Sequence, residues 1–173
     1  MIRLLKILPI LIAGYLCICC NCKGPADDID KLIANSDLIF EGNILSVKPD
    51  TATHTYAVTF KITRVYKGER LKTVTVRSTS EGDCELLIDK SEGDDKEFIG
   101  RHYLLYVNKG TGEYNFDYCK NWVISDSYID YNYTNRTYKR KKDPETSMWF
   151  KDQISVLNEA MRKIRRGPVK AHH

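Results

Sequence analysis

The distribution of six cysteines constrains the fold of this 173-residue chain more than any other feature. Four of them crowd into residues 17–22, and the other two, Cys84 and Cys119, lie far apart in the rest of the chain. Cysteines spread in this way are typical of a small domain that disulfides hold together in an oxidising compartment. The chain is long enough to bury one hydrophobic core, so the bridges would staple a single domain.

The first residues predict where the mature protein begins. Two basic residues precede an apolar run over residues 7–16, which has the length of a signal-peptide core. The small-x-small rule for signal peptidase places the cut after Cys19, so residues 1–19 are expected to be a signal peptide. The cut leaves Cys20 as the first mature residue and an even set of four cysteines, enough for two bridges. The expected product is a secreted, extracellular domain.

A bacterial lipoprotein is the alternative interpretation of the same cysteines. In such proteins a lipidated cysteine at the mature N-terminus anchors the domain to the cell envelope. The residues before Cys17, Cys19 and Cys20 fit a lipoprotein cleavage box poorly. Secretion is therefore the first expectation, and a lipid anchor through Cys20 is the second.

The mature chain has the pattern of short strands flanked by helices. Residues 26–35 can form a short helix, and the polar, glycine-containing stretch 91–97 predicts a surface loop. Alternating apolar and polar residues, separated by turn residues, predict strands at 38–47 with a bulge or bend at Gly42, and at 56–62, 74–76, 103–107 and 114–118. Five strands at this spacing predict a mainly β, α+β fold, an OB-fold-like five-stranded barrel with flanking helices.

The clearest helix follows these strands. Asp143 can cap its N-terminus, Pro144 suits its first turn, and Gly167 would end it. Apolar residues at alternating steps of four and three define one face, formed by Phe150, Ile154, Leu157, Met161 and Ile164. We expect this face to pack on the barrel. The predicted organisation after the leader is a barrel domain at 20–125, a polar and basic connection at 126–142, and the helix at 143–167.

Charge does not select a partner class for the whole domain. The chain has 27 Lys and Arg against 23 Asp and Glu, so it is close to neutral. The basic residues are uneven, however, with one run at 139–142 and a second formed by Arg162, Lys163, Arg165 and Arg166. These runs predict a contact with an anionic glycan or an anionic membrane surface. Alternatively, they bind nothing, and the first is a solvent-exposed loop and the second a solvent-exposed helix end.

Several short segments, in the order in which they occur, carry a family resemblance. They are Cys20-Asn21-Cys22, ANSDLIFEGNILSV from Ala34, YKG, Cys84, GRHYLLYV and Cys119. In order and approximate spacing they resemble a netrin-like domain of the tissue-inhibitor-of-metalloproteinases (TIMP) family, over nearly all of residues 20–125. The resemblance implies the disulfides Cys20–Cys84 and Cys22–Cys119, one of three connectivities open to four cysteines.

The chain also departs from the pattern of that family. Ala34 stands where the family commonly has a further cysteine, and no cysteine follows Cys119, so one whole bridge is absent. Glu85 follows Cys84, where the family often has glycine. The second domain of the vertebrate inhibitors is replaced here by the helical tail.

The resemblance implies inhibition of a zinc metalloendopeptidase. A free α-amine has a pKa of about 8, so the neutral amine of Cys20 can bind the protease zinc together with the carbonyl oxygen of the same residue. This pair would occupy the coordination position that a catalytic zinc keeps for water. The inhibitory segment is then Cys20, Asn21, Cys22 and Lys23, with the Asn21 side chain in the pocket beside the zinc. The alternative is a netrin-like binding module that inhibits nothing, in which the bridges only staple the fold.

Other classes of function have little support in the sequence. The four histidines do not lie at the spacing of zinc ligands, and no nucleophile elbow or catalytic cysteine context is present, so neither enzymatic activity nor a cofactor is expected. Tyrosines on the predicted sheet could stack on bases, but export and disulfide bonding argue against a nucleic-acid partner. Asn132 and Asn135 each begin a glycosylation sequon.

Overall fold

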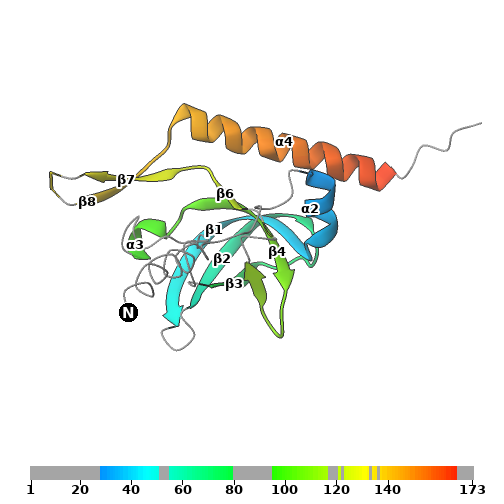
Figure 1. The fold of residues 1–173 in the computed structure, drawn as a ribbon, viewed down its shortest axis with the longest axis horizontal. Coiled ribbons are helices and arrows are strands. Elements are labelled where there is room, and N and C mark those ends of the chain that lie inside the picture. The colour runs from blue at the N-terminus through cyan, green and yellow to red at the C-terminus, as the bar shows by residue number, and fades with distance from the viewer. Residues whose placement is uncertain are drawn as a thin grey trace, which may run out of the picture.

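A computed structural model describes residues 28–50, 55–79, 95–116, 121, 123–132, 134–135 and 137–166. These residues form three helices and eight strands (Figure 1). The helices are α2 (Ile29–Asn35), α3 (Asp95–Phe98) and α4 (Pro144–Arg166). The strands are β1 (Leu38–Asp50), β2 (Thr55–Lys67), β3 (Thr73–Thr79), β4 (His102–Lys109), β5 (Tyr114–Phe116), β6 (Val123–Ser125), β7 (Tyr128–Asn132) and β8 (Thr137–Lys141).

Five of the strands close into a barrel, which confirms the predicted OB-fold-like α+β class. Their hydrogen-bonded order is β1-β2-β3-β5-β4, and β4 pairs back with β1 from Leu38↔Val107 to Asn43↔His102. The β3–β5 pairing is parallel and the others are antiparallel. The predicted irregularity at Gly42 is present as a register shift between Glu41 and Gly42. The short strand β6 adds to the other edge of β4.

The barrel is filled by side chains that alternate along its strands. Phe60 lies at the centre, with its ring in edge-on contact with Phe40 at 5.5 Å and with Tyr103 at 6.1 Å between ring centroids. Such edge-to-face pairs add to the energy of burial. The buried members of this core are Leu38, Phe40, Ile44, Val58, Phe60, Val74, Val76, Phe98, Tyr103, Leu105, Val107 and Phe116.

A second hydrophobic cluster joins the outside of the barrel to the helices. Ile39 of β1 and Leu104 of β4 point away from the barrel core and are fully buried beneath α2 and α4. Because β1 and β4 are covered on both faces, both strands carry apolar residues at successive positions. The buried members are Leu32, Ile33, Ile39, Tyr66, Leu104, Tyr106, Ile124, Phe150, Leu157 and Ala160.

Helix α4 lies along one side of the barrel (Figure 1). The predicted cap is confirmed, since the Asp143 carboxylate accepts from the Thr146 amide at 2.9 Å. Phe150 and Leu157 are buried as predicted, and Ile154 and Met161 are partly buried beside them. The prediction for Ile164 is wrong, because this side chain is 54% exposed and the buried face ends one turn earlier.

Two other segments differ from their sequence-based predictions. The stretch 91–97 was expected to be a surface loop, but its last residues belong to α3, which places Phe98 in the barrel core with 1% exposure. A four-residue helix is too short to show a helical period in the sequence. The polar connection contains the strands β7 and β8, which pair with each other as a separate hairpin (Figure 1).

The turn after β2 requires glycine. Gly68 has a φ of 92°, and a Cβ atom at this position would lie 2.4 Å from the Asp37 carbonyl oxygen. Only a residue without a side chain fits both the left-handed backbone and this close approach. The turn therefore holds the end of β2 against the residues that lead into β1.

Candidate functional site

The predicted inhibitory segment lies outside the described residues. This applies to Cys20, Asn21, Cys22 and Lys23 and to the expected bridge partners Cys84 and Cys119, so both disulfides stay predictions. Among the sequon residues, Asn135 is exposed in the turn between β7 and β8, and Asn132 ends β7. Among the described residues, no group of three His, Cys, Asp or Glu side chains could hold a metal ion. No described helix has both the length and the apolar character needed to cross a membrane.

A group of interacting polar side chains lies where β1, β2 and β4 meet α4. Glu41 faces Arg64 across the β1–β2 ladder, and Asn43 faces His102 across the β1–β4 ladder. Arg64 and Tyr66 are two residues apart on β2, so both point to the side of the sheet that α4 covers. Strand pairing thus brings together residues that are far apart in the sequence.

Glu41 is the centre of a hydrogen-bond network in this interface. Its carboxylate accepts from the Tyr66 hydroxyl and lies 3.1 Å from His102 Nε2. His102 Nδ1 lies 2.8 Å from Asn43 Oδ1, and the Asn43 amide nitrogen donates to the Gly100 carbonyl at 3.3 Å. Both nitrogens of the imidazole therefore lie beside side-chain oxygens, one of Glu41 and one of Asn43.

The network holds Glu41 in its charged form. Burial acts to raise the pKa of Glu41, but the hydrogen bonds from His102 and Tyr66 and the positive charges of His102 and Arg64 outweigh it, so the pKa lies below the ordinary value. Burial and the adjacent carboxylate raise the pKa of Tyr66. The Tyr66 hydroxyl therefore keeps its proton and acts as a donor to Glu41.

Replacing Glu41 by glutamine should destabilise the fold in a pH-dependent way. At pH 7 we expect a loss of about 1–3 kcal/mol in the free energy of unfolding, because the change removes charge-assisted hydrogen bonds from a largely buried carboxylate. Since the pKa of Glu41 is lowered in the folded state, its contribution is complete above its ordinary value of 4.5 and disappears as the pH falls through the folded-state pKa.

Urea unfolding of the two proteins between pH 6 and pH 3 measures this difference. The gap between their unfolding free energies should narrow below pH 4.5. Glu69→Gln makes the same chemical change at an exposed site and should alter stability by less than about 0.5 kcal/mol. A gap that stays constant down to pH 3 would contradict the role given to the Glu41 charge.

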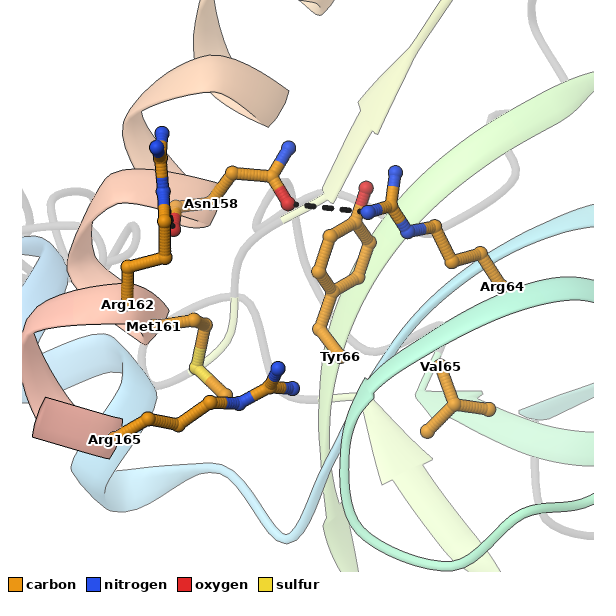
Figure 2. Close-up of a pocket in the computed structure, with 7 residues that line it drawn as sticks. All are labelled: Arg64, Val65, Tyr66, Asn158, Met161, Arg162 and Arg165. Carbon is orange, nitrogen blue, oxygen red and sulfur yellow. Dashed lines mark hydrogen bonds between the residues drawn. The ribbon is translucent and has the colours of Figure 1, made fainter.

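A hollow of about 400 Å³ opens between β2 and α4, next to this network (Figure 2). Three arginines contribute to its wall, Arg64 from β2 and Arg162 and Arg165 from α4. The remaining lining residues are Val65, Tyr66, Asn158 and Met161. The hollow therefore combines a cationic rim with a partly apolar wall.

Contacts with neighbouring residues hold two of the arginines, Arg64 through side chains and Arg162 through a backbone carbonyl. The Arg64 guanidinium carbon lies 4.7 Å from the centre of the Tyr66 ring, and Arg64 Nη2 donates to Asn158 Oδ1 at 3.2 Å. Arg162 Nε donates to the Asn158 carbonyl oxygen at 3.3 Å. Arg165 extends from α4 toward Tyr66 in Figure 2. Asn158 thus links the helix to the barrel strand through Arg64.

The sequence identified part of this site. It grouped Arg162, Lys163, Arg165 and Arg166 as one basic run, and the structure separates them. Arg162 and Arg165 are three residues apart, so they share a helix face and line the hollow. Lys163 instead pairs with Glu159 at 2.9 Å. Arg64 was not identified as a site residue from the sequence. No local pattern in β2 indicates that the outer face of this strand lies against a helix about 90 residues later in the chain.

Comparisons with known proteins do not add an assignment, since no protein-family model matches the sequence and no curated protein is significantly similar to it.

Proposed function

We propose that this chain is an exported netrin-like module that inhibits a zinc metalloendopeptidase through its mature N-terminus. The observation that carries the proposal is the position in the barrel of the segments that resemble the family. The segment from Ala34 forms the end of α2 and most of β1, YKG ends β2, and GRHYLLYV forms most of β4. These three segments are neighbours in the fold, not only in a sequence pattern.

Their contacts are direct. Leu38 pairs with Val107 and Ile39 with Lys67, so β1 lies between the other two segments. Gly68 approaches Asp37 so closely that no larger residue fits. Residues that form one continuous surface of a closed barrel constrain one another, which supports a shared fold with the netrin-like modules better than isolated matches would.

The proposed mechanism uses the first mature residue as a ligand in trans. The neutral amine and the carbonyl oxygen of Cys20 would form a chelate on the zinc of the protease and displace the water that attacks the substrate. Bridges from Cys20 to Cys84 and from Cys22 to Cys119 would hold the terminus rigid, which reduces the entropy lost on binding. Asn21 would enter the pocket beside the zinc, with Lys23 at the edge of the contact.

Selective blocking of the α-amine tests this proposal. The mature protein beginning at Cys20 should inhibit at least one member of a broad panel of zinc metalloendopeptidases. Acetylation near pH 6.5 modifies the α-amine before the lysines, because its pKa is lower by about 2.5 units, and it should abolish the inhibition. Mass spectrometry of the first peptide verifies the site of modification, and an unchanged melting temperature verifies the fold.

Two outcomes would reject the inhibitor. One is a free N-terminus that inhibits no protease of the panel, and the other is an acetylated protein that inhibits as well as the unmodified one. A naturally lipidated Cys20 would have no free amine, and it would support the non-inhibitory, anchored binding module instead.

A further inference from the structure

We propose that the hollow between β2 and α4 binds a doubly charged tetrahedral oxyanion, of which a phosphate group, free or as a monoester, is the common biological form. The inference is independent of protease inhibition, because it uses only described residues of the barrel and helix. It rests on the charge balance of the hollow, on the contacts that hold two of its arginines, and on its size.

The charge balance of the hollow is strongly positive. Among the described residues, no carboxylate lies within ion-pair distance of Arg64, Arg162 or Arg165. The acid opposite Arg64 is Glu41, whose carboxylate already binds Tyr66 and His102. Three guanidinium groups that line one hollow repel one another electrostatically, and an anion bound between them would replace this repulsion by attraction.

Glu159 lies on α4 close to the helical arginines, but its ion pair is with Lys163. Its pKa is lowered first by the hydrogen bond from Lys163 and by the charge of that residue, with a smaller effect of Arg162. Glu159 is exposed and forms its ion pair with Lys163. The Glu159 carboxylate is therefore paired with Lys163, which does not line the hollow.

Two of the three arginines are held by neighbouring groups before any ligand arrives. Arg64 is held by the Tyr66 ring and by Asn158, and Arg162 is held by the Asn158 carbonyl. The Asn158 side-chain nitrogen has no acceptor among the described residues, so it is a further donor at the wall. Donors whose side chains are already ordered lose less entropy on binding.

The number of donors favours a tetrahedral dianion over a carboxylate. A planar carboxylate matches the fork of one arginine, whereas a phosphate group has enough oxygens to accept from several guanidinium groups on different sides. The Tyr66 ring, Val65 and Met161 exclude water from part of the wall and strengthen these contacts. A volume of about 400 Å³ also leaves room for the small organic part of a monoester.

Calorimetric titration of the full mature protein with glycerol phosphate and with inorganic phosphate tests the proposal. At pH 7.5 a phosphate monoester is mainly dianionic. We expect saturable, one-to-one binding of at least one of the two, and the tighter one identifies the ester or the free ion as the natural form. Sodium acetate at equal ionic strength should give no saturable heat.

A matched pair of variants locates the site. Arg165→Gln and Arg166→Gln remove the same charge from adjacent exposed positions, but only Arg165 lines the hollow. Arg165→Gln should weaken binding about tenfold or more, and Arg166→Gln should change it less than about twofold. Arg64→Gln should weaken binding similarly from the opposite wall, and Arg165→Lys should restore only part of the affinity, because a lysine lacks the planar fork.

The proposal fails if neither phosphate ligand binds saturably to the unmodified protein. It also fails if Arg165→Gln and Arg166→Gln weaken binding equally, since that result indicates a diffuse attraction to the basic residues at the C-terminal end of α4. Acetate that binds as tightly as phosphate would reject the tetrahedral dianion. Circular dichroism of each variant verifies that the helix remains folded.

Discussion

Removal of residues 143–173 is expected to leave the barrel largely unfolded at 37 °C. Two side chains of α4, Phe150 and Leu157, are 6% and 0% exposed, and a fully buried residue of this size contributes about 1.5–3 kcal/mol. The truncation also uncovers Ile39, Leu104 and their neighbours on the barrel. The resulting loss of several kcal/mol is a large part of the 5–15 kcal/mol that is typical of a domain. The melting temperature and the urea midpoint measure it.

Single substitutions in α4 separate packing from a general effect of shortening the chain. Leu157→Ala should cost about 2–5 kcal/mol, because it opens a cavity between the helix and the barrel. Val156→Ala, at the preceding and 46% exposed position, should cost less than about 1 kcal/mol. Equal melting temperatures for the full-length and truncated proteins would show that the helix does not stabilise the barrel.

One alanine added before Cys20 should abolish protease inhibition while the fold remains intact. The added residue separates the terminal amine from the Cys20 carbonyl and puts a side chain where the zinc should lie. In an enzyme active site a misplacement of about 1 Å can lower the rate about a hundredfold, and a whole added residue moves the amine farther than this. The measurement is the inhibition constant against the most sensitive protease of the panel.

One alanine added after His173 is the matched control. It lengthens the chain equally, at the other end, and should leave inhibition unchanged.

Asn21→Gly should alter which protease is preferred more than it alters the melting temperature, because the side chain would contact the partner and not its own core. Equal inhibition by the N-terminally extended and natural proteins would overturn the chelation mechanism.

Local periodicity explains which parts of the fold were predictable. The face of α4 follows from the spacing of Phe150, Leu157 and Met161, since a helix of 23 residues repeats its pattern several times. The strands of the barrel follow from alternation and turn residues, and Gly68 marks the end of one strand. Helix α3 was missed because its one apolar residue, Phe98, has no repeat that a pattern could show.

The polar network and the hollow depend on pairings between distant residues. His102 meets Glu41 only because β4 closes the barrel against β1, and Arg64 meets Asn158 only because α4 crosses β2. A single sequence contains strand patterns but no direct record of which strands are neighbours. The sequence showed the arginines that α4 contributes to the hollow as part of a basic run. The residues that β2 contributes could be identified only from the three-dimensional structure.

The seam between β1 and β4 has a consequence for how the chain folds. Leu38 must find Val107 across most of the barrel sequence, so closure is a long-range event and should be slower than formation of the neighbouring β1–β2 and β2–β3 pairs. Ile39 and Leu104, one from each side of the seam, both contribute to the surface that receives α4. We therefore expect the helix to dock after closure, and until then the free edges of β1 and β4 can pair with strands of other chains. The time that this seam takes to close therefore sets how long the newly made chain is exposed to aggregation.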